Sequence, residues 1–284
     1  MPFTTIYDGG TRVIGDTSIT GIVPQSIHPN VFAYIAAQNS VGYAMSRVEI
    51  DAVNNLVWGM VGSGLWDKMQ VVYPCIGNNA ASFKWNLKDT TTFNITFQGS
   101  WIYASTGMQI AAANLANRGL TGWFPNINGA VGDVHISIYV RNFATTVTSS
   151  LFGSYYSLAG GGVMVGGQVT ANNINTWVQN AGTISGTIPI SGYSGGMLIG
   201  SRLTSTGVAI STLNGGIASS NLNTTTGVRN SQQVWIGNAQ IISGVAAVPQ
   251  EIAFASLGLG LSRIDMRNFY TIVQAFQTKL GRQV

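Results

Sequence analysis

The sequence predicts a mainly β protein, an antiparallel sandwich or barrel with a short helical segment before it and one amphipathic helix after it. From about residue 83 to residue 255, short runs rich in β-branched and aromatic residues alternate with turns of Gly, Asn, Ser and Thr. On both sides of this region, apolar residues recur at the spacing of a helix. Apolar residues make up 45% of the 284 positions, which is enough for a large core.

Residues 1–28 are expected to form an extended arm with one or two short strands. The segment is rich in Thr, Ile, Gly and Asp, and it alternates only weakly between apolar and polar residues. Such an arm can add a strand to the open sheet edge of a neighbour, where main-chain hydrogen bonds supply affinity. We therefore expect the arm to be the attachment element, acting through four apolar residues, Ile14, Ile19, Ile22 and Val23.

Residues 29–75 are expected to form a helical lead-in. A short helix is expected over residues 29–38, with Pro29 in its first turn. A longer helix is expected over residues 46–61, where Ser46 and Glu49 match a capping box and Gly62 follows. Its apolar face consists of Ile50, Val53, Val57 and Met60.

The stretch GLWDKM at residues 64–69 indicates one helical turn after a glycine stop. Trp66 and Met69 are expected to fold back onto the preceding helix, while Asp67 and Lys68 face water. Pro74 excludes further helix, so we expect the chain to become extended there and to lead into the first strand of the sandwich.

Residues 76–284 are expected to form the sandwich and the closing helix. The run HISIYV at residues 135–140 alternates with period two, and LNGG at residues 213–216 is typical of an Asn-Gly hairpin. Short strands of this kind favour two antiparallel sheets packed face to face. Further runs with strand composition are FNITFQG, GVMVGGQV, TWVQ, TISGTIPI, GMLIGSR, GVAISTLN and QVWIGNAQI.

The C-terminal segment predicts an amphipathic helix over residues 263–280. Ser262 is its expected N-cap, Asp265 follows three residues later, and Gly281 stops the helix. A helix of this length needs a partner surface, either the sandwich or the N-terminal helix. The apolar face consists of Ile264, Phe269, Ile272, Val273, Phe276 and Leu280.

Composition argues against several classes of function. Charged residues are only 8% of the chain, and the Lys and Arg residues that produce the net charge of +4 are scattered singly, so we expect no nucleic-acid binding. No apolar run is long enough for a membrane span, and the first residues do not resemble an export signal, so we expect the protein to be made in a cytoplasm and not to be exported by a classical route. The single cysteine, Cys75, is expected to be a small buried side chain.

The motifs that suggest catalysis are weak. GYSGG at residues 192–196 resembles the surroundings of a nucleophilic serine, but both histidines, His28 and His135, precede Ser194, which excludes the order Ser, Asp, His. Glu49 and Asp51 in EID suggest the carboxylate pair of a β-sandwich glucanase, but no third acid follows and the segment has helical spacing. We therefore expect no catalytic residues, and the dispersed acids and histidines predict no metal or cofactor site.

Aromatic and amide side chains remain as candidates for binding. Flat aromatic faces stack on sugar rings, and Asn side chains form hydrogen bonds with their hydroxyl groups, although most such rings serve as core or interface anchors. The candidates for glycan binding are Tyr155, Tyr156, Tyr193 and Trp177.

One family resemblance is specific. AVNNLVWGMVGSGLWDKMQVVYPCIGNNAASFKWNLKD at residues 52–89, followed by FNITFQGSWIYASTG, resembles a family of tailed-bacteriophage virion proteins with a concanavalin A-like (LamG-like) jelly-roll domain. Matching segments recur at HISIYVRN, IGSR, IGNA and the closing FYTIVQAFQTKLGR, so the resemblance covers residue 31 to the end. Cys75 departs from the family pattern, in which an aromatic residue is commoner. The resemblance implies a jelly-roll sandwich and a structural role without catalytic residues.

Together these observations predict a non-enzymatic structural protein of a tailed-phage virion, used in head decoration, a head fibre or a tail fibre, with weak glycan binding as a further candidate role. The implied partners are other virion proteins, further copies of the chain, with a trimer as the expected state, and host-surface or environmental glycans. Two alternatives stay open: a glycan-cleaving enzyme on a β-sandwich fold, and a free carbohydrate-binding lectin.

Overall fold

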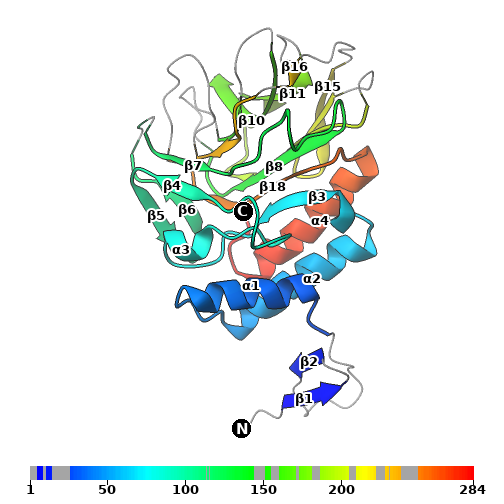
Figure 1. The fold of residues 1–284 in the computed structure, drawn as a ribbon. Coiled ribbons are helices and arrows are strands. Elements are labelled where there is room, and N and C mark those ends of the chain that lie inside the picture. The colour runs from blue at the N-terminus through cyan, green and yellow to red at the C-terminus, as the bar shows by residue number, and fades with distance from the viewer. Residues whose placement is uncertain are drawn as a thin grey trace.

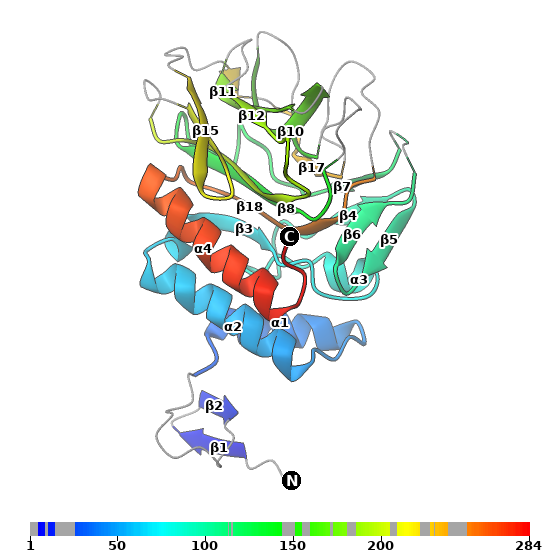
Figure 2. The same cartoon turned by 180° about the vertical axis from the view of Figure 1, so that it is seen from behind.

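The computed structural model describes residues 5–8, 11–14, 26–112, 114, 116–143, 151–154, 160–170, 173–180, 186–204, 209–221, 228–229, 231–237 and 249–284. These residues form three layers (Figure 1): an outer sheet, an inner sheet packed against it, and helices that cover the far face of the inner sheet. Figure 2 shows the same layers from behind. The predicted fold class, a mainly β antiparallel jelly-roll sandwich with a helical lead-in and a C-terminal helix, is confirmed.

The inner sheet holds the central strands of the molecule. β8 (Val134–Val140) and β18 (Ile252–Gly258) lie side by side at its centre, and β3 (Met69–Tyr73) also pairs with β18. The order of the other strands is β15 (Gly216–Asn221), β14 (Ala209–Leu213) and β13 (Gly196–Arg202) before β8, and β6 (Gly107–Ile110) and β5 (Trp101–Ala104) after β18.

The outer sheet combines the two longest of the described strands, β10 (Gly160–Thr170) and β11 (Asn173–Asn180), with several short ones. Its order is β12 (Gly186–Pro189), β11, β10, β9 (Phe152–Ser154), β17 (Trp235–Ile236), β7 (Arg118–Leu120) and β4 (Thr96–Gln98). β16 (Val228–Arg229) pairs with β10 in parallel, whereas the other strand pairs of the described residues are antiparallel.

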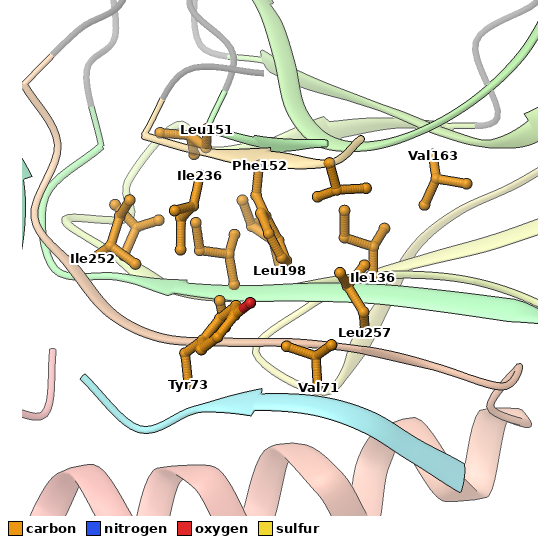
Figure 3. Packing of buried hydrophobic residues seen from close by; sticks show 14 of the residues in the cluster. Val71, Tyr73, Ile136, Leu151, Phe152, Val163, Leu198, Ile236, Ile252 and Leu257 are labelled. Atoms are coloured by element: carbon orange, nitrogen blue, oxygen red, sulfur yellow. The ribbon is translucent and has the colours of Figure 1, made fainter. Parts of the chain in front are cut away.

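The core between the two sheets is apolar. Val71 and Tyr73 point from β3 toward Phe152 and Ile236 of the outer sheet (Figure 3), and all four side chains are buried. The neighbouring residues of β3, Met69 and Val72, belong instead to the apolar cluster under the helices. The alternating residues Val71, Val72 and Tyr73 therefore contribute side chains both to the core between the sheets and to the apolar cluster under the helices.

The layered arrangement explains an unusual burial pattern in β8. Alternation of polar and apolar residues is typical of a strand with one face in water, yet all seven residues of β8 are buried. Val134, Ile136, Ile138 and Val140 face the outer sheet, while His135, Ser137 and Tyr139 lie under the helical layer. The polar residues of this strand are therefore enclosed.

The helices are α1 (Pro29–Ser40), α2 (Arg47–Gly62), a 3-10 turn η1 (Trp66–Lys68), α3 (Ala80–Phe83) and α4 (Arg263–Lys279). The three longer helices confirm the predictions. The predicted capping box of Ser46 with Glu49 and the predicted N-cap Ser262 are both formed, and Ser262 makes a second capping box with Asp265. The buried side of α2 includes Val53, Val57 and Met60, as expected.

Three local expectations are corrected. Lys68 does not simply face water, because its Nζ lies 2.7 Å from Oδ2 of Asp265 and ties η1 to the start of α4. The extended chain begins at Met69, before Pro74, because β3 pairs with β18 directly after η1. Ile264 is 60% exposed, because the buried side of α4 is formed by Met266, Phe269, Val273 and Phe276. Trp66 and Met69 are buried as predicted, and Asp67 is exposed.

The Asn-Gly hairpin is confirmed between β14 and β15. Asn214 and Gly215 have φ values of 49° and 76°, as a two-residue hairpin turn of the primed type requires. A Cβ on Gly215 would lie 2.7 Å from Cδ1 of Tyr270, so the turn also fits closely against α4.

In the arm, β1 (Thr5–Asp8) and β2 (Thr11–Ile14) pair as an antiparallel hairpin, which agrees with the predicted short strands. Ile14 is the last residue of β2, and Ile19, Ile22 and Val23 lie outside the described residues. The division into segments 1–28, 29–75 and 76–284 stays a prediction, although β3 already belongs to the inner sheet. In the part of the chain that is described, no helix has both the length and the apolarity to cross a bilayer.

Candidate ligand-binding face

The two sheets differ in how much of their surface is covered. α1, α2 and α4 all lie on the side of the inner sheet that faces away from the outer sheet, as both views show (Figures 1 and 2), and none of the described helices lies on the outward face of the outer sheet. An uncovered sheet face carried on a rigid scaffold is a common place for ligand contacts. The outward residues of this sheet are therefore the first candidates for a site.

Strands β4, β7 and β17 bring together outward residues that are distant in the sequence. Gln98 pairs with Arg118, and Trp235 pairs with Leu120 on one side and with Gly153 on the other. The residues between them, Gly119 and Ile236, point inward, because a Cβ on Gly119 would lie 2.6 Å from Cγ2 of Ile236 in the core. We call Gln98, Arg118, Leu120 and Trp235 the Arg118 site.

Arg118 is held from two directions in this site. Its Nε donates a hydrogen bond of 2.7 Å to Oε1 of Gln98 on β4. Its Cζ lies over the Trp235 ring, 4.2 Å from the centroid, a cation–π contact. Because Gly153 on the far side of Trp235 has no side chain, no bulk opposes the indole there. The guanidinium is thus fixed in place while the residue remains partly exposed.

The site is rich in hydrogen-bond donors that lack acceptors. Nε1 of Trp235 is shielded from water and has no hydrogen-bond partner. Among the described residues, nothing accepts a hydrogen bond from Nη1 or Nη2 of Arg118, and no carboxylate forms an ion pair with it. The terminal nitrogens of Arg118, on a partly exposed residue, therefore suit a ligand that carries oxygen acceptors.

The distribution of acidic residues along the chain also leaves this site without carboxylate acceptors. Between Thr90 and Gln250 the only acidic residue is Asp133, and the strands of the outer sheet all lie between Thr96 and Ile236. Asp133 precedes β8 of the inner sheet, and its Oδ1 accepts a hydrogen bond from the backbone N–H of Gly260. The outer sheet therefore carries no acidic side chain in any of its strands.

The four residues predicted for glycan binding are placed elsewhere or outside the described residues. Tyr193 lies in the connection from β12 to β13 and is 49% exposed. Trp177 lies in β11 of the outer sheet opposite Met164, and the description of this residue is limited to its backbone. Tyr155 and Tyr156 are outside the described residues. Their role in sugar stacking stays a prediction.

Sequence reasoning missed Gln98, Arg118 and Trp235. Their spacing along the chain matches no motif, and only the pairing of β4 with β7 and of β7 with β17 brings them together. One sequence signal could have directed attention to them: the stretch from Thr90 to Gln250 contains a single acid, Asp133, and Arg118 is the first of its four arginines.

The residues weighed for catalysis have structural partners. Oε2 of Glu49 accepts hydrogen bonds from the N–H and Oγ of Ser46, and Asp51 pairs with Arg47 at 3.0 Å, both on α2. His28 is the N-cap of α1, and its Nδ1 accepts from the backbone N–H of Asn30 at 3.2 Å. Ser194 lies in an exposed connection, where its carbonyl oxygen accepts from the N–H of Phe143.

His135 lies in a buried network under the helical layer. Its Nδ1 is 2.6 Å from the carbonyl oxygen of Leu259, its Nε2 is 3.0 Å from Oγ of Ser256, and that oxygen is 2.8 Å from Oγ of Ser137. Because a carbonyl can only accept, Nδ1 carries the proton and Nε2 accepts from Ser256. Burial lowers the pKa of His135 to about 4; the hydrogen bond to Leu259 opposes this shift and the charge of Lys68 adds to it. His135, Ser137 and Ser256 are fully buried, so this serine–histidine pair is closed to a substrate.

A pocket lies where α2, the turn after β5 and the C-terminal tail meet. This pocket of about 320 Å³ is lined by Ser46, Val48, Glu49, Ile76, Ser105, Leu280 and Arg282. Its charged groups already have partners: Glu49 accepts from Ser46 and Tyr43, and Arg282 donates to the carbonyl oxygens of Cys75, Pro74 and Ala253. Cys75 is buried, as predicted, and burial raises the pKa of its thiol to about 12.

No cluster of three or more His, Cys, Asp or Glu side chains suited to a metal ion occurs within the described ranges. The expectation that the protein uses no metal and no cofactor stays a prediction.

The comparisons with known proteins agree with the fold. No family model matches this chain, and no curated protein matches it. The chain is similar to a solved structure of botulinum neurotoxin type C, studied for its interaction with two ganglioside molecules, with 15% identity and a TM-score of 0.55 over 75% of this chain and 53% of that one. It is also similar to the binding domain of botulinum neurotoxin DC in complex with rat synaptotagmin II, with 13% identity and a TM-score of 0.53 over 74% of this chain and 52% of that one.

A third similar structure is a mutant of Trypanosoma rangeli sialidase that displays trans-sialidase activity, with 9% identity and a TM-score of 0.52 over 81% of this chain and 38% of that one. The chain therefore spans about half or less of the length of these three structures. At these identities the similarity shows the fold alone, an antiparallel sandwich of the jelly-roll type.

Proposed function

We propose that this protein is a non-enzymatic structural protein of a tailed-phage virion that binds glycans with the outward face of its outer sheet. The observation that carries the glycan part is the Arg118 site, which lies on a sheet face without a described helix, holds a fixed guanidinium and has no acidic side chain in its strands. Sugar hydroxyl groups offer the oxygen acceptors that this site lacks, and sugar rings stack on aromatic faces.

The absence of acids supports binding without cleavage. Glycoside hydrolysis in most families needs two carboxyl groups on either side of the scissile bond. The strands of the outer sheet carry no Asp or Glu, and Glu49 and Asp51 lie on α2 under the inner sheet, engaged with Ser46 and Arg47. A glycan bound at the Arg118 site would therefore meet no acid–base pair from these strands.

Replacing Trp235 with Ala is expected to weaken glycan binding by about tenfold or more, because the substitution removes the indole surface and the platform that holds Arg118. The measurement is a glycan array followed by titration of the strongest ligand, with circular dichroism to confirm folding. The matched comparison is the triple variant Tyr155→Ala, Tyr156→Ala, Tyr193→Ala. If the triple variant loses binding and Trp235→Ala keeps it, the site lies in the loops and not on β17.

The virion part of the proposal is supported by the resemblance of residues 31–284 to phage virion proteins and by the low charge of the chain, which makes close packing against neighbours electrostatically easy. The arm is proposed as the attachment element, the partners as other virion proteins and further copies of the chain, with a trimer as the expected state. The protein is then made in the infected bacterium and resides in the particle.

Deleting residues 1–25 is expected to leave a folded sandwich that no longer enters particles. The cut preserves Ser26, whose carbonyl oxygen accepts hydrogen bonds from Nε1 of Trp58 at 2.9 Å and from Nδ2 of Asn54 at 3.3 Å. Folding is measured by thermal unfolding, and incorporation by immunoblot of purified particles from cells that express the full-length or the shortened chain. Incorporation at the full-length level would show that the arm is not the anchor, and a free lectin would enter particles in neither form.

A further inference from the structure

We propose that the Arg118 site selects acidic glycans, whose sugars carry carboxylate or sulfate groups, and that Arg118 is the residue that makes the selection. This inference rests on the proposed function and names the ligand class of the same site. It starts from the guanidinium, because its terminal nitrogens are the charged groups of the site with no acceptor among the described residues.

The geometry presents these nitrogens to an anion. The hydrogen bond to Gln98 uses Nε of the guanidinium, and its Cζ lies 4.2 Å from the centroid of the Trp235 ring. Nη1 and Nη2 donate no hydrogen bond to a described residue, so their N–H groups are available to a ligand. A planar pair of donors held in this way matches two oxygens of a carboxylate or a sulfate.

The surroundings leave the positive charge uncompensated. The described ion pairs lie elsewhere, between Arg47 and Asp51, Lys68 and Asp265, and Arg141 and Glu251. With no acid in any strand of the outer sheet, an approaching anion meets no like charge from those strands. A cation without a protein counter-ion favours an anionic ligand over a neutral one of the same shape.

Arg118 also covers part of the Trp235 ring. A neutral sugar that packs on the indole competes with the guanidinium for this surface, whereas an acidic sugar uses the guanidinium itself. Removing the arginine should therefore abolish the preference for acidic sugars without abolishing binding to neutral ones.

The experiment measures the affinity of the full-length protein for three soluble polysaccharides of similar length: a neutral glucan, a polyuronate and a sulfated glucan. The wild type is expected to bind one or both anionic polymers about tenfold more tightly than the neutral one at 150 mM salt, a difference typical of charge-assisted hydrogen bonds. Arg118→Gln is expected to bring the affinities to within about twofold while neutral binding is kept or rises. Arg118→Lys is expected to recover only part of the preference, because Lys has no planar pair of donors.

The matched control is Arg263→Gln, which makes the same change of charge at an exposed position on α4 of the helical layer. If this control lowers the preference as much as Arg118→Gln, the preference reflects net charge and the inference is wrong. It is equally wrong if the wild type binds all three polymers alike or if Arg118→Gln keeps the preference. Binding to neutral glycans alone would contradict the inference but support the proposed function, whereas binding to no glycan in the polymer set or the array would overturn both.

Discussion

Replacing Arg282 with Ala is expected to lower the free energy of unfolding by about 3 kcal/mol, the largest effect we expect from a single substitution outside the apolar cores. The side chain is 1% exposed. Nη1 donates to the carbonyl oxygen of Cys75 at 2.8 Å, and Nη2 donates to those of Pro74 and Ala253 at 2.6 and 3.0 Å. Nε donates to Oε1 of Gln277 at 2.7 Å.

These bonds join three parts of the molecule: the end of β3, the start of β18 and the last turn of α4. Without the guanidinium, the buried carbonyl groups of Cys75 and Pro74 lose their donor, while that of Ala253 keeps a hydrogen bond from Nε2 of Gln277 at 3.2 Å. Each unsatisfied group costs about 1–3 kcal/mol. Two effects reduce the total. Burial disfavours the charge and lowers the pKa of Arg282 to about 10, so its removal also relieves a penalty. The adjoining pocket also gives water a route to the freed carbonyl groups.

The measurement is urea unfolding of both proteins at pH 7.5. The control is Arg267→Ala, which removes an exposed arginine from the same chain end and is expected to change the free energy of unfolding by less than about 0.5 kcal/mol. Equal effects of the two substitutions would show that the tail is not held by Arg282.

Acid is expected to destabilise the protein through His135, by up to about 3 kcal/mol between pH 6.5 and pH 4. The pKa of His135 in the folded protein is lowered from 6.5 to about 4. In that interval the unfolded chain binds a proton at this residue and the folded chain does not. Stability therefore rises with pH: the contribution of the neutral histidine is complete above pH 6.5 and is lost as the pH falls toward 4.

The test compares the pH dependence of unfolding for the wild type and His135→Gln, with urea titrations at pH 7.5, 5.5 and 4. The variant should be less stable than the wild type at pH 7.5, because the bonds to Leu259 and Ser256 are altered, and should lose less stability on acidification. Parallel curves would mean that other groups produce the acid sensitivity. Titration of the His135 ring by NMR gives an independent check, because a midpoint near 6.5 would contradict the buried neutral state.

The sequence by itself determined the elements whose signals are local. The capping boxes at Ser46 and Ser262 and the spacing of apolar residues defined α2 and α4 within one or two residues of their ends. Asn214 and Gly215 defined the β14–β15 hairpin, because only residues that tolerate positive φ form that turn. The mainly β class and an antiparallel sandwich or barrel followed from the same kind of pattern, since each short strand carries its own composition and turns. The jelly-roll was implied by the family resemblance.

The tertiary structure decided everything that depends on contacts between distant segments. β18, a near-continuous apolar run, is central because both of its faces are covered, and periodicity does not identify such a strand. His135 and Ser137 are polar yet buried, because the helices cover a sheet face that alternation alone would assign to water. Arg118 reaches Trp235, and Arg282 reaches Cys75, only through strand pairing and chain packing across more than a hundred residues. The Arg118 site and the hydrogen bonds of Arg282 depend on tertiary packing. Their interactions form between groups that the chain brings together only when it folds.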